Sequence, residues 1–251
     1  MEKYAAVILA AGKGTRMNEG QASPIPKVMF EAVGKPVIHY SVQSIQKAGI
    51  KKIVLVVGYK KAMVMDYFKD EVEYVVQEKQ LGTGHAAICA KSKLEGKAQA
   101  VIIFYGDNPL FKPETIKKLI NLYEKEEPTI AMLSVVFADP MHWAFGRIIR
   151  NQKGEVASII EQKDCTEKQL KIAESNPGFY IISADWFWQN SPQIQTNNIQ
   201  KEYYLTDIVE IAEEQGKKVL AMPVSEESEA LGVNTPEQLK EAEEVIKQRH
   251  L

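Results

Sequence analysis

The sequence has few of the features that mark secreted, membrane-bound or nucleic-acid-binding proteins. Its two cysteines, Cys89 and Cys165, lie far apart and outside any CxxC pattern, which favours free thiols in a reduced compartment over a disulfide framework. No apolar stretch approaches the ~20 residues of a membrane-spanning helix. The apolar run near the start leads directly into a glycine turn, unlike a signal peptide. We therefore expect a cytoplasmic protein without a membrane partner.

Neither positive nor negative side chains are in large excess. The 31 basic and 33 acidic side chains give a net charge of −2, which gives no support for a nucleic-acid-binding surface. A local basic pocket for a phosphate group remains compatible with this balance. With 45% hydrophobic residues in 251, the chain can form one large α/β domain or two small ones.

Strand-like and helix-like segments alternate through the first half of the sequence. Short β-rich runs predict strands over residues 4–10, 52–57, 72–76 and 100–105. Apolar residues at helical spacing predict helices over residues 35–48, 61–68, 84–90 and 113–126. This alternation through about residue 130 predicts a parallel sheet covered on both sides.

The second half is richer in strands. We expect strands over residues 129–137, 145–150, 156–162, 178–183 and 218–223, and helices over residues 204–215 and 236–248. Thr235 is the expected N-cap of the terminal helix. The sequence contains no internal repeat, low-complexity segment or long linker. Residues 1–251 are therefore predicted to form a single domain whose second half adds a mixed β lobe over the sheet edge.

A glycine-rich turn follows the first predicted strand. In the segment from Gly12 to Arg16, glycines allow a sharp bend that can direct backbone N–H groups at phosphate oxygens. Lys13, Arg16 and Lys27 would add positive charge. The spacing matches neither the GxxxxGK[ST] nor the GxGxxG motif. A phosphate-binding turn and a simple tight turn with solvated lysines both remain open on these residues alone.

Two further loops follow predicted strands. Gln77 precedes a glycine-containing loop, and its amide can both donate to and accept from the imide edge of a pyrimidine, although an ordinary loop glutamine is the alternative. His85 has no partner at metal-ligand spacing and is expected to pack or to support a neighbour. Asp107 ends the strongest central strand, where α/β proteins bind ligands, and is either a Mg²⁺ ligand or a turn cap.

Several segments in the second half of the sequence place polar residues beside glycine, and these segments suit either a sugar pocket or turns and helix caps.

The complete set of motifs occurs in an order that resembles the N-terminal uridylyltransferase domain of bacterial N-acetylglucosamine-1-phosphate uridylyltransferases. The matching segments are LAAGKGTRM (9–17), PK (26–27), QLGTGHA (80–86), YGD-PL (105–110), FGRI (145–148), E-KD (161–164), N-G (176–178), EYYLTD (202–207) and GVN (232–234).

This resemblance implies a Rossmann-like α/β fold: a mixed, mostly parallel sheet flanked by helices, with a small mixed β lobe over the sugar site. It implies a nucleotide-binding half over about residues 1–130, a sugar-binding half over about 131–235 and a terminal helix over 236–251. It implies a nucleotide site of Leu9, Ala10, Ala11, Gly12, Lys13, Gly14, Gln77, Gly82 and Thr83. The implied sugar site consists of Tyr105, Gly106, Gly146, Glu161, Asn176, Tyr204 and Thr206. Arg16, Lys27 and Asp107 would be catalytic, and Asp107 and Asn234 would hold Mg²⁺.

The implied reaction is the Mg²⁺-dependent transfer of a uridylyl group from UTP to an N-acetylhexosamine-1-phosphate. The first alternative is the same reaction with another sugar-1-phosphate, or with CTP or dTTP in place of UTP. The second is a non-catalytic homologue that binds nucleotide or sugar. Full-length relatives continue into a left-handed β-helix with acetyltransferase activity, which is not expected here. Pro177 and the segment Met141 to Ala144 differ from the family pattern near the sugar. The longer segment between Arg16 and Lys27 suggests a lid or an extra contact, and the oligomeric state is left open.

Overall fold

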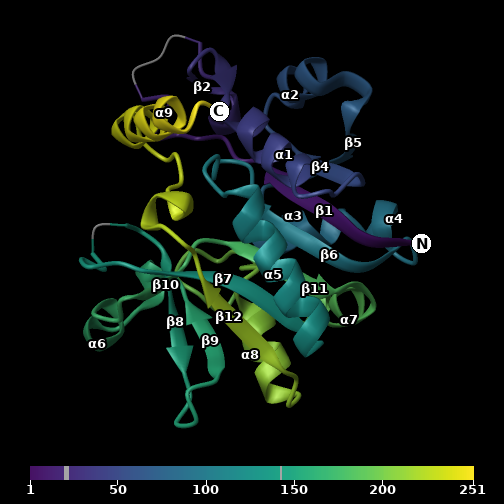
Figure 1. Ribbon diagram of the computed structural model, residues 1–251, viewed down its shortest axis with the longest axis vertical. Coiled ribbons are helices and arrows are strands. Elements are labelled where there is room, and N and C mark those ends of the chain that lie inside the picture. Colours follow the sequence, from purple (N-terminus) through teal and green to yellow (C-terminus); the bar gives the residue numbers. More distant parts are fainter. Residues whose placement is uncertain (20–22, 142) are drawn as a thin grey trace.

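The computed structural model describes residues 1–19, 23–141 and 143–251 (Figure 1). Strands from both halves of the chain form one mixed β-sheet. Ten strands in these residues pair in the order β5-β4-β1-β6-β11-β7-β10-β8-β9, with β12 on β7. Their bounds are β1 Glu2–Ala10, β4 Ile53–Val57, β5 Glu73–Val76, β6 Ala98–Tyr105, β7 Ile130–Val136, β8 Gly146–Arg150, β9 Val156–Ile160, β10 Glu174–Asn176, β11 Phe179–Ser183 and β12 Val219–Pro223.

The first-half strands of this sheet, β1, β4, β5 and β6, are parallel, as the alternation of elements predicted. β1 pairs in parallel with both β4 and β6, and β4 pairs in parallel with β5, whereas β11 is antiparallel to β6 and β7. The strand order reverses direction between β1 and β6. In open α/β sheets such a reversal leaves a crevice outside the carboxyl ends of the strands. The glycine turn and Asp107 follow these two strands and therefore meet at that crevice.

Alternate residues of the central strands pack against helices on opposite faces. Ala6 and Ile8 of β1 face one apolar cluster, whereas Val7 and Leu9 face the other. The first cluster contains residues of α1 (Val37–Lys47), α2 (Lys61–Phe68) and α5 (Pro113–Glu126). The second contains residues of α3 (Thr83–Cys89), α4 (Lys91–Leu94), α7 (Ala184–Asn190) and α8 (Asp207–Glu214). This two-faced packing is the helix-covered sheet that the sequence predicted.

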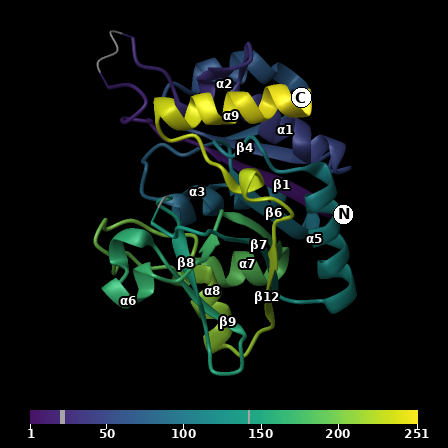
Figure 2. The ribbon, with the colours of Figure 1, turned by 60° about the vertical axis from the view of Figure 1, so that its left-hand side comes forward.

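The last helix returns to the first half of the chain. Helix α9 (Pro236–Arg249) lies beside the paired strands β2 (Glu31–Ala32) and β3 (Lys35–Pro36), and Figure 2 shows it crossing above α1. Thr235 caps it by accepting a hydrogen bond from Gln238 N, which confirms the predicted N-cap. None of the helices in the described ranges is long and apolar enough to span a bilayer.

The predicted elements differ from the structure mainly at boundaries and in short pieces. The helix predicted to begin at Tyr204 begins instead at Asp207, because the backbone before it is used elsewhere: Leu205 N donates to Thr83 Oγ1. The sequence pattern did not predict α7, α6 (Glu167–Leu170) or β10. It also did not predict the 3₁₀ turns at Lys27–Met29, Lys69–Glu71, Gln162–Asp164, Ser191–Gln193 and Glu227–Ala230. Cys89 and Cys165 are free thiols, as expected.

Candidate functional site

A cavity of about 520 Å³ opens at the carboxyl ends of β1 and β6. Its walls come from the glycine turn after β1, the loop before α3, the end of β6, the start of β8, the residue that follows β9 and the segment before α9. These segments are far apart in the sequence but meet where the strand order reverses. The cavity therefore occupies the crevice that this sheet topology provides for a ligand.

Gln77 is held firmly at one end of the cavity. Only 3% of its surface is exposed, and its Nε2 donates to Gly82 O at 3.0 Å and lies 2.9 Å from His85 Nδ1. With His85 Nδ1 as acceptor, both amide hydrogens are used, so the side-chain carbonyl oxygen of Gln77 remains as an acceptor without a partner among the described residues. His85 thus supports a neighbouring residue, as the sequence led us to expect.

The loop between Gln77 and α3 is fixed by direct contact with the segment that contains Tyr203. Gly82 adopts a φ of +113°, and a Cβ there would lie 2.5 Å from Tyr203 O. Tyr203 O accepts from Gly84 N at 2.7 Å, and Tyr203 N donates to Leu81 O at 2.8 Å. Only glycine tolerates this combination of backbone conformation and contact, so the segment before α8 fixes the shape of the loop.

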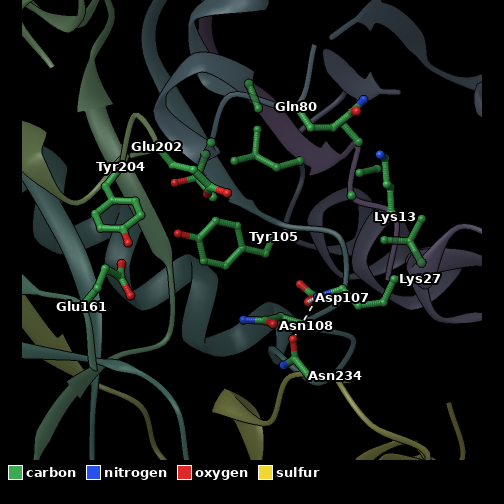
Figure 3. Close-up of a pocket in the computed structure, with 18 of the residues that line it drawn as sticks. Lys13, Lys27, Gln80, Tyr105, Asp107, Asn108, Glu161, Glu202, Tyr204 and Asn234 are labelled. Atoms are coloured by element: carbon green, nitrogen blue, oxygen red, sulfur yellow. Dashed lines mark hydrogen bonds and ion pairs between the residues drawn. The ribbon is translucent and has the colours of Figure 1, made fainter. Parts of the chain in front are cut away.

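Positive side chains meet two acceptor oxygens, one from Asp107 and one from Asn234, at the other end of the cavity (Figure 3). Lys27 Nζ contacts a carboxylate oxygen of Asp107 and lies 3.0 Å from Asn234 Oδ1, and Arg16 Nη2 lies 3.2 Å from that same oxygen. Val233 N donates to Asp107 O at 2.9 Å. The backbone therefore joins the two segments that carry Asp107 and Asn234.

The donor set suits a hard cation. A carboxylate and an amide oxygen already converge on one ammonium group, and Mg²⁺ prefers such oxygens while retaining water and phosphate ligands. Within residues 1–19, 23–141 and 143–251, no group of three or more His, Cys, Asp or Glu side chains gathers to hold a metal. Asp107 and Asn234 supply two oxygen atoms that could bind such a cation.

Glu161 lies on the opposite wall with hydroxyl groups around it. Thr206 Oγ1 donates to Glu161 Oε1 at 3.2 Å. Burial raises the pKa of Glu161 to about 7, the Thr206 hydrogen bond opposes this rise, and the nearby Asp207 and Asp164 add to it. Burial likewise raises the pKa of Tyr105. Figure 3 shows the Tyr105 and Tyr204 hydroxyls directed toward Glu161, so this wall carries a carboxyl group and two phenol side chains, and the Tyr204 hydroxyl is buried within it.

Asn176 completes this wall at the turn between β10 and β11. Its Oδ1 accepts from Gly178 N at 3.0 Å, and its Nδ2 donates to Tyr180 Oη at 2.6 Å. Each amide atom keeps one unused hydrogen-bonding position. Asn176 can therefore both define the turn and contact a ligand.

The cavity brings together seventeen of the residues expected to form the site. These are Leu9, Ala10, Ala11, Gly12, Lys13, Arg16, Lys27, Gln77, Gly82, Thr83, Tyr105, Asp107, Gly146, Glu161, Asn176, Tyr204 and Asn234. Gly14, Gly106 and Thr206 do not line it. Gly14 packs against Lys27, Gly106 N donates to Leu9 O at 2.9 Å, and Thr206 acts through Glu161.

Eight residues of the lining were not predicted from the sequence, namely Val28, Gln80, Ala86, Asn108, Ala144, Phe145, Gln200 and Glu202. Five of them fall inside quoted motifs, so membership of a motif was a usable signal for Gln80, Ala86, Asn108, Phe145 and Glu202. Met141 to Ala144 was flagged as unusual, and His142 lies outside the described residues, as do residues 20–22 of the longer segment between Arg16 and Lys27.

The family to which this fold and site correspond follows from comparison with known proteins. Residues 6–163 match the family described as MobA-like NTP transferase domain. The chain belongs to this family. The matched region includes the glycine turn, Gln77, Asp107 and Glu161, so it contains most of the cavity wall. The resemblance stated from the motifs is confirmed at the level of the family.

Individual relatives agree with this assignment. A protein named bifunctional protein GlmU from Clostridium novyi (strain NT) is 44% identical over 245 residues, covering 97% of this chain and 52% of that protein. Another of that name from Caldanaerobacter subterraneus subsp. tengcongensis is 41% identical over 251 residues, covering 99% of this chain and 53% of that protein. The chain thus spans about half the length of the curated relatives it matches.

A solved structure supports the fold of this NTP transferase domain. The crystal structure of UDP-glucose pyrophosphorylase complexed with UDP-glucose has a TM-score of 0.81 to this chain at 20% identity. The similarity covers 99% of this chain and 100% of that chain. The expected fold class, a mixed and largely parallel sheet flanked by helices, is therefore confirmed.

Proposed function

We propose that this NTP transferase domain transfers a uridylyl group from UTP to an N-acetylhexosamine-1-phosphate, N-acetylglucosamine-1-phosphate first, and releases pyrophosphate in the cytoplasm. One observation carries the proposal: a single cavity joins a cationic end containing Lys27, Asp107 and Asn234 to a wall of hydroxyl-binding side chains around Glu161. This arrangement suits a reaction between a nucleoside triphosphate and a sugar phosphate. In this proposal residues 1–130 mainly bind nucleotide and residues 131–235 mainly bind sugar.

The environment of Gln77 favours a uracil base. Because its amide hydrogens are directed to Gly82 O and His85 Nδ1, its free carbonyl oxygen can accept from the N3–H of uracil. Cytosine presents an acceptor at N3 and would leave this oxygen unpaired, which costs binding free energy. The UDP-glucose bound in the structural neighbour and the similarity to the GlmU proteins support the same choice.

The proposed chemistry needs no protein nucleophile. A phosphate oxygen of the sugar-1-phosphate attacks the α-phosphorus of UTP in line, the bond from that phosphorus to the bridging oxygen breaks, and pyrophosphate leaves. Lys13, Arg16 and Lys27 would hold the triphosphate and offset the repulsion between the two anions. Mg²⁺, held by Asp107 and Asn234, would supply Lewis-acid stabilisation of the charge on the phosphates.

Two alternatives share the same cavity. One keeps the reaction and changes the sugar phosphate or uses CTP or dTTP. The other is a homologue that binds nucleotide or sugar without turnover. The presence of Arg16, Lys27, Asp107 and Asn234 together argues for catalysis, because a binding protein need not keep the cationic and the metal-type groups in one place.

A pyrophosphate-release assay separates these possibilities. UTP, CTP and dTTP are each combined with several sugar-1-phosphates in the presence of Mg²⁺. We expect the largest kcat/KM with UTP and N-acetylglucosamine-1-phosphate. A larger value for another pair would replace the substrates, and absence of turnover with every pair would remove the enzymatic assignment.

A further inference from the structure

Asn108 connects three segments of the candidate site, although none of the expected roles includes it. It follows Asp107 directly, only 3% of its surface is exposed, and it lines the cavity. Its Nδ2 donates to the carbonyl oxygen of Pro177 at 2.7 Å, and this hydrogen bond is buried. The residue after the metal-type carboxylate is thus bonded to the turn that carries Asn176.

The other amide atom of Asn108 faces the segment that carries Asn234. A Cβ at Gly232 would lie 2.8 Å from Asn108 Oδ1 and 3.5 Å from Asn234 Nδ2. The lack of a side chain at Gly232 is therefore what allows Asn108 to lie against this segment. Figure 3 shows Asn108 beside both Asp107 and Asn234.

The backbone of Asn108 is fixed as well. Ser41, a buried residue of α1, places its Oγ 3.2 Å from both Gly106 O and Asn108 O. The backbone of Asn108 is therefore anchored to helix α1, and its side chain lines the cavity and reaches Pro177 O. A rigid residue in this position can transmit the location of β6 to a loop on the opposite wall.

The turn that Asn108 holds needs such support. Gly178 adopts a φ of +79°, and a Cβ there would lie 2.1 Å from Tyr105 Cε2. Pro177 has no N–H to donate, so its carbonyl oxygen is the polar backbone group through which residue 177 can be bonded. Without the Asn108 donor, this buried oxygen would lose its partner, and a buried acceptor without a partner is costly.

We propose that Asn108 is a positioning residue that fixes the sugar-binding turn Asn176 to Gly178 relative to the carboxylate of Asp107. The inference rests on the proposed function, since it assigns that turn to the sugar phosphate. Asn108 sets the separation between the sugar and the metal-bound phosphates, so its loss should affect the sugar phosphate much more than UTP.

The test compares two buried asparagines. Asn108→Leu removes the donor while keeping the number and branching of the side-chain heavy atoms. Asn190→Leu is the matched control, because Asn190 is 7% exposed, donates from Nδ2 to Trp186 O at 2.8 Å and lies on α7 away from the cavity. KM for UTP, KM for the sugar-1-phosphate and kcat are measured for both variants and for the unsubstituted domain.

We expect Asn108→Leu to raise KM for the sugar-1-phosphate about tenfold and to change KM for UTP less than about twofold. Asn190→Leu should change neither KM by more than about twofold while lowering the unfolding temperature. Should Asn108→Leu not fold, Asn108→Ser, whose hydroxyl is too short to reach Pro177 O, should show the same selective rise in KM.

An unchanged sugar-1-phosphate KM, or an equal rise of both KM values, would overturn the positioning role. Absence of turnover in the unsubstituted domain would instead refute the proposed function. In that case calorimetric binding of the sugar-1-phosphate to the same variants decides the role of Asn108: affinity lost only in the Asn108 variants supports it, and equal affinities refute it.

Discussion

The carboxyl group of Glu161 should make the stability of this domain depend on pH. Burial raises its pKa to about 7 in the folded chain, whereas an unfolded glutamate has a pKa near 4.3. Between these values the folded state binds the proton more tightly than the unfolded state. The free energy of unfolding therefore falls as pH rises through this window, and the loss is complete above about pH 8.

The size of the effect follows from the two pKa values. Each unit between them is worth about 1.4 kcal/mol, so Glu161 should destabilise the domain by about 2.5 kcal/mol between about pH 5 and about pH 8. Glu161→Gln removes this ionisation and keeps the shape of the side chain. Asp207, whose pKa burial raises to about 6, titrates in both proteins, so its contribution largely cancels in the comparison.

Urea unfolding of both proteins at the two pH values measures this difference. The stability advantage of Glu161→Gln over the unsubstituted domain should increase by about 2.5 kcal/mol from about pH 5 to about pH 8. Glu241→Gln, at an exposed position of α9, is the control for loss of one carboxyl and should show no comparable change. A difference that stays constant within about 0.5 kcal/mol would refute a buried Glu161 carboxyl with a raised pKa.

Three further substitutions test other parts of the site. Thr206→Val removes the hydrogen bond to Glu161 Oε1. Because this bond lowers the pKa of Glu161, the folded-state pKa obtained from urea unfolding should rise above about 7. Asp107→Ala should lower Mg²⁺-dependent kcat/KM about a hundredfold and leave the unfolding temperature within about 3 °C; retained activity would remove Asp107 from the metal site. Lys27→Met frees the Asp107 carboxylate and removes one of the two cationic contacts of Asn234 Oδ1, the other being Arg16, so nucleotide-free Mn²⁺ should bind more tightly by electron paramagnetic resonance while turnover falls; unchanged Mn²⁺ affinity would contradict this competition.

The central sheet was predictable because its strands are buried almost completely. Every residue of β4 is buried, and a continuous aliphatic run, β-branched at every position except Leu55, between polar residues and a glycine has few other interpretations. Helix α7 was not predictable in this way. Its sequence ADWFWQN is short and aromatic, and it forms because Phe187 and Trp188 pack against the sheet, which is a tertiary effect.

The composition of the site was more predictable than its geometry. Motif order and family resemblance pointed to Lys27, Asp107 and Asn234 together, but not to the contact between the Lys27 ammonium and both oxygen donors. The bonding role of Asn108 could not be found from the sequence, since an asparagine after a strand is typical of a turn. Its partner Pro177 lies 69 residues away, and only the folded sheet brings the two together.

The proposed reaction is tested most directly by ³¹P nuclear magnetic resonance of one mixture. The domain is incubated with UTP, N-acetylglucosamine-1-phosphate and Mg²⁺, and a parallel sample contains a metal chelator. We predict equal amounts of a UDP-sugar diphosphate signal and inorganic pyrophosphate in the first sample and neither in the second. Unchanged UTP and sugar-phosphate signals in the presence of Mg²⁺ would contradict the proposed uridylyl transfer.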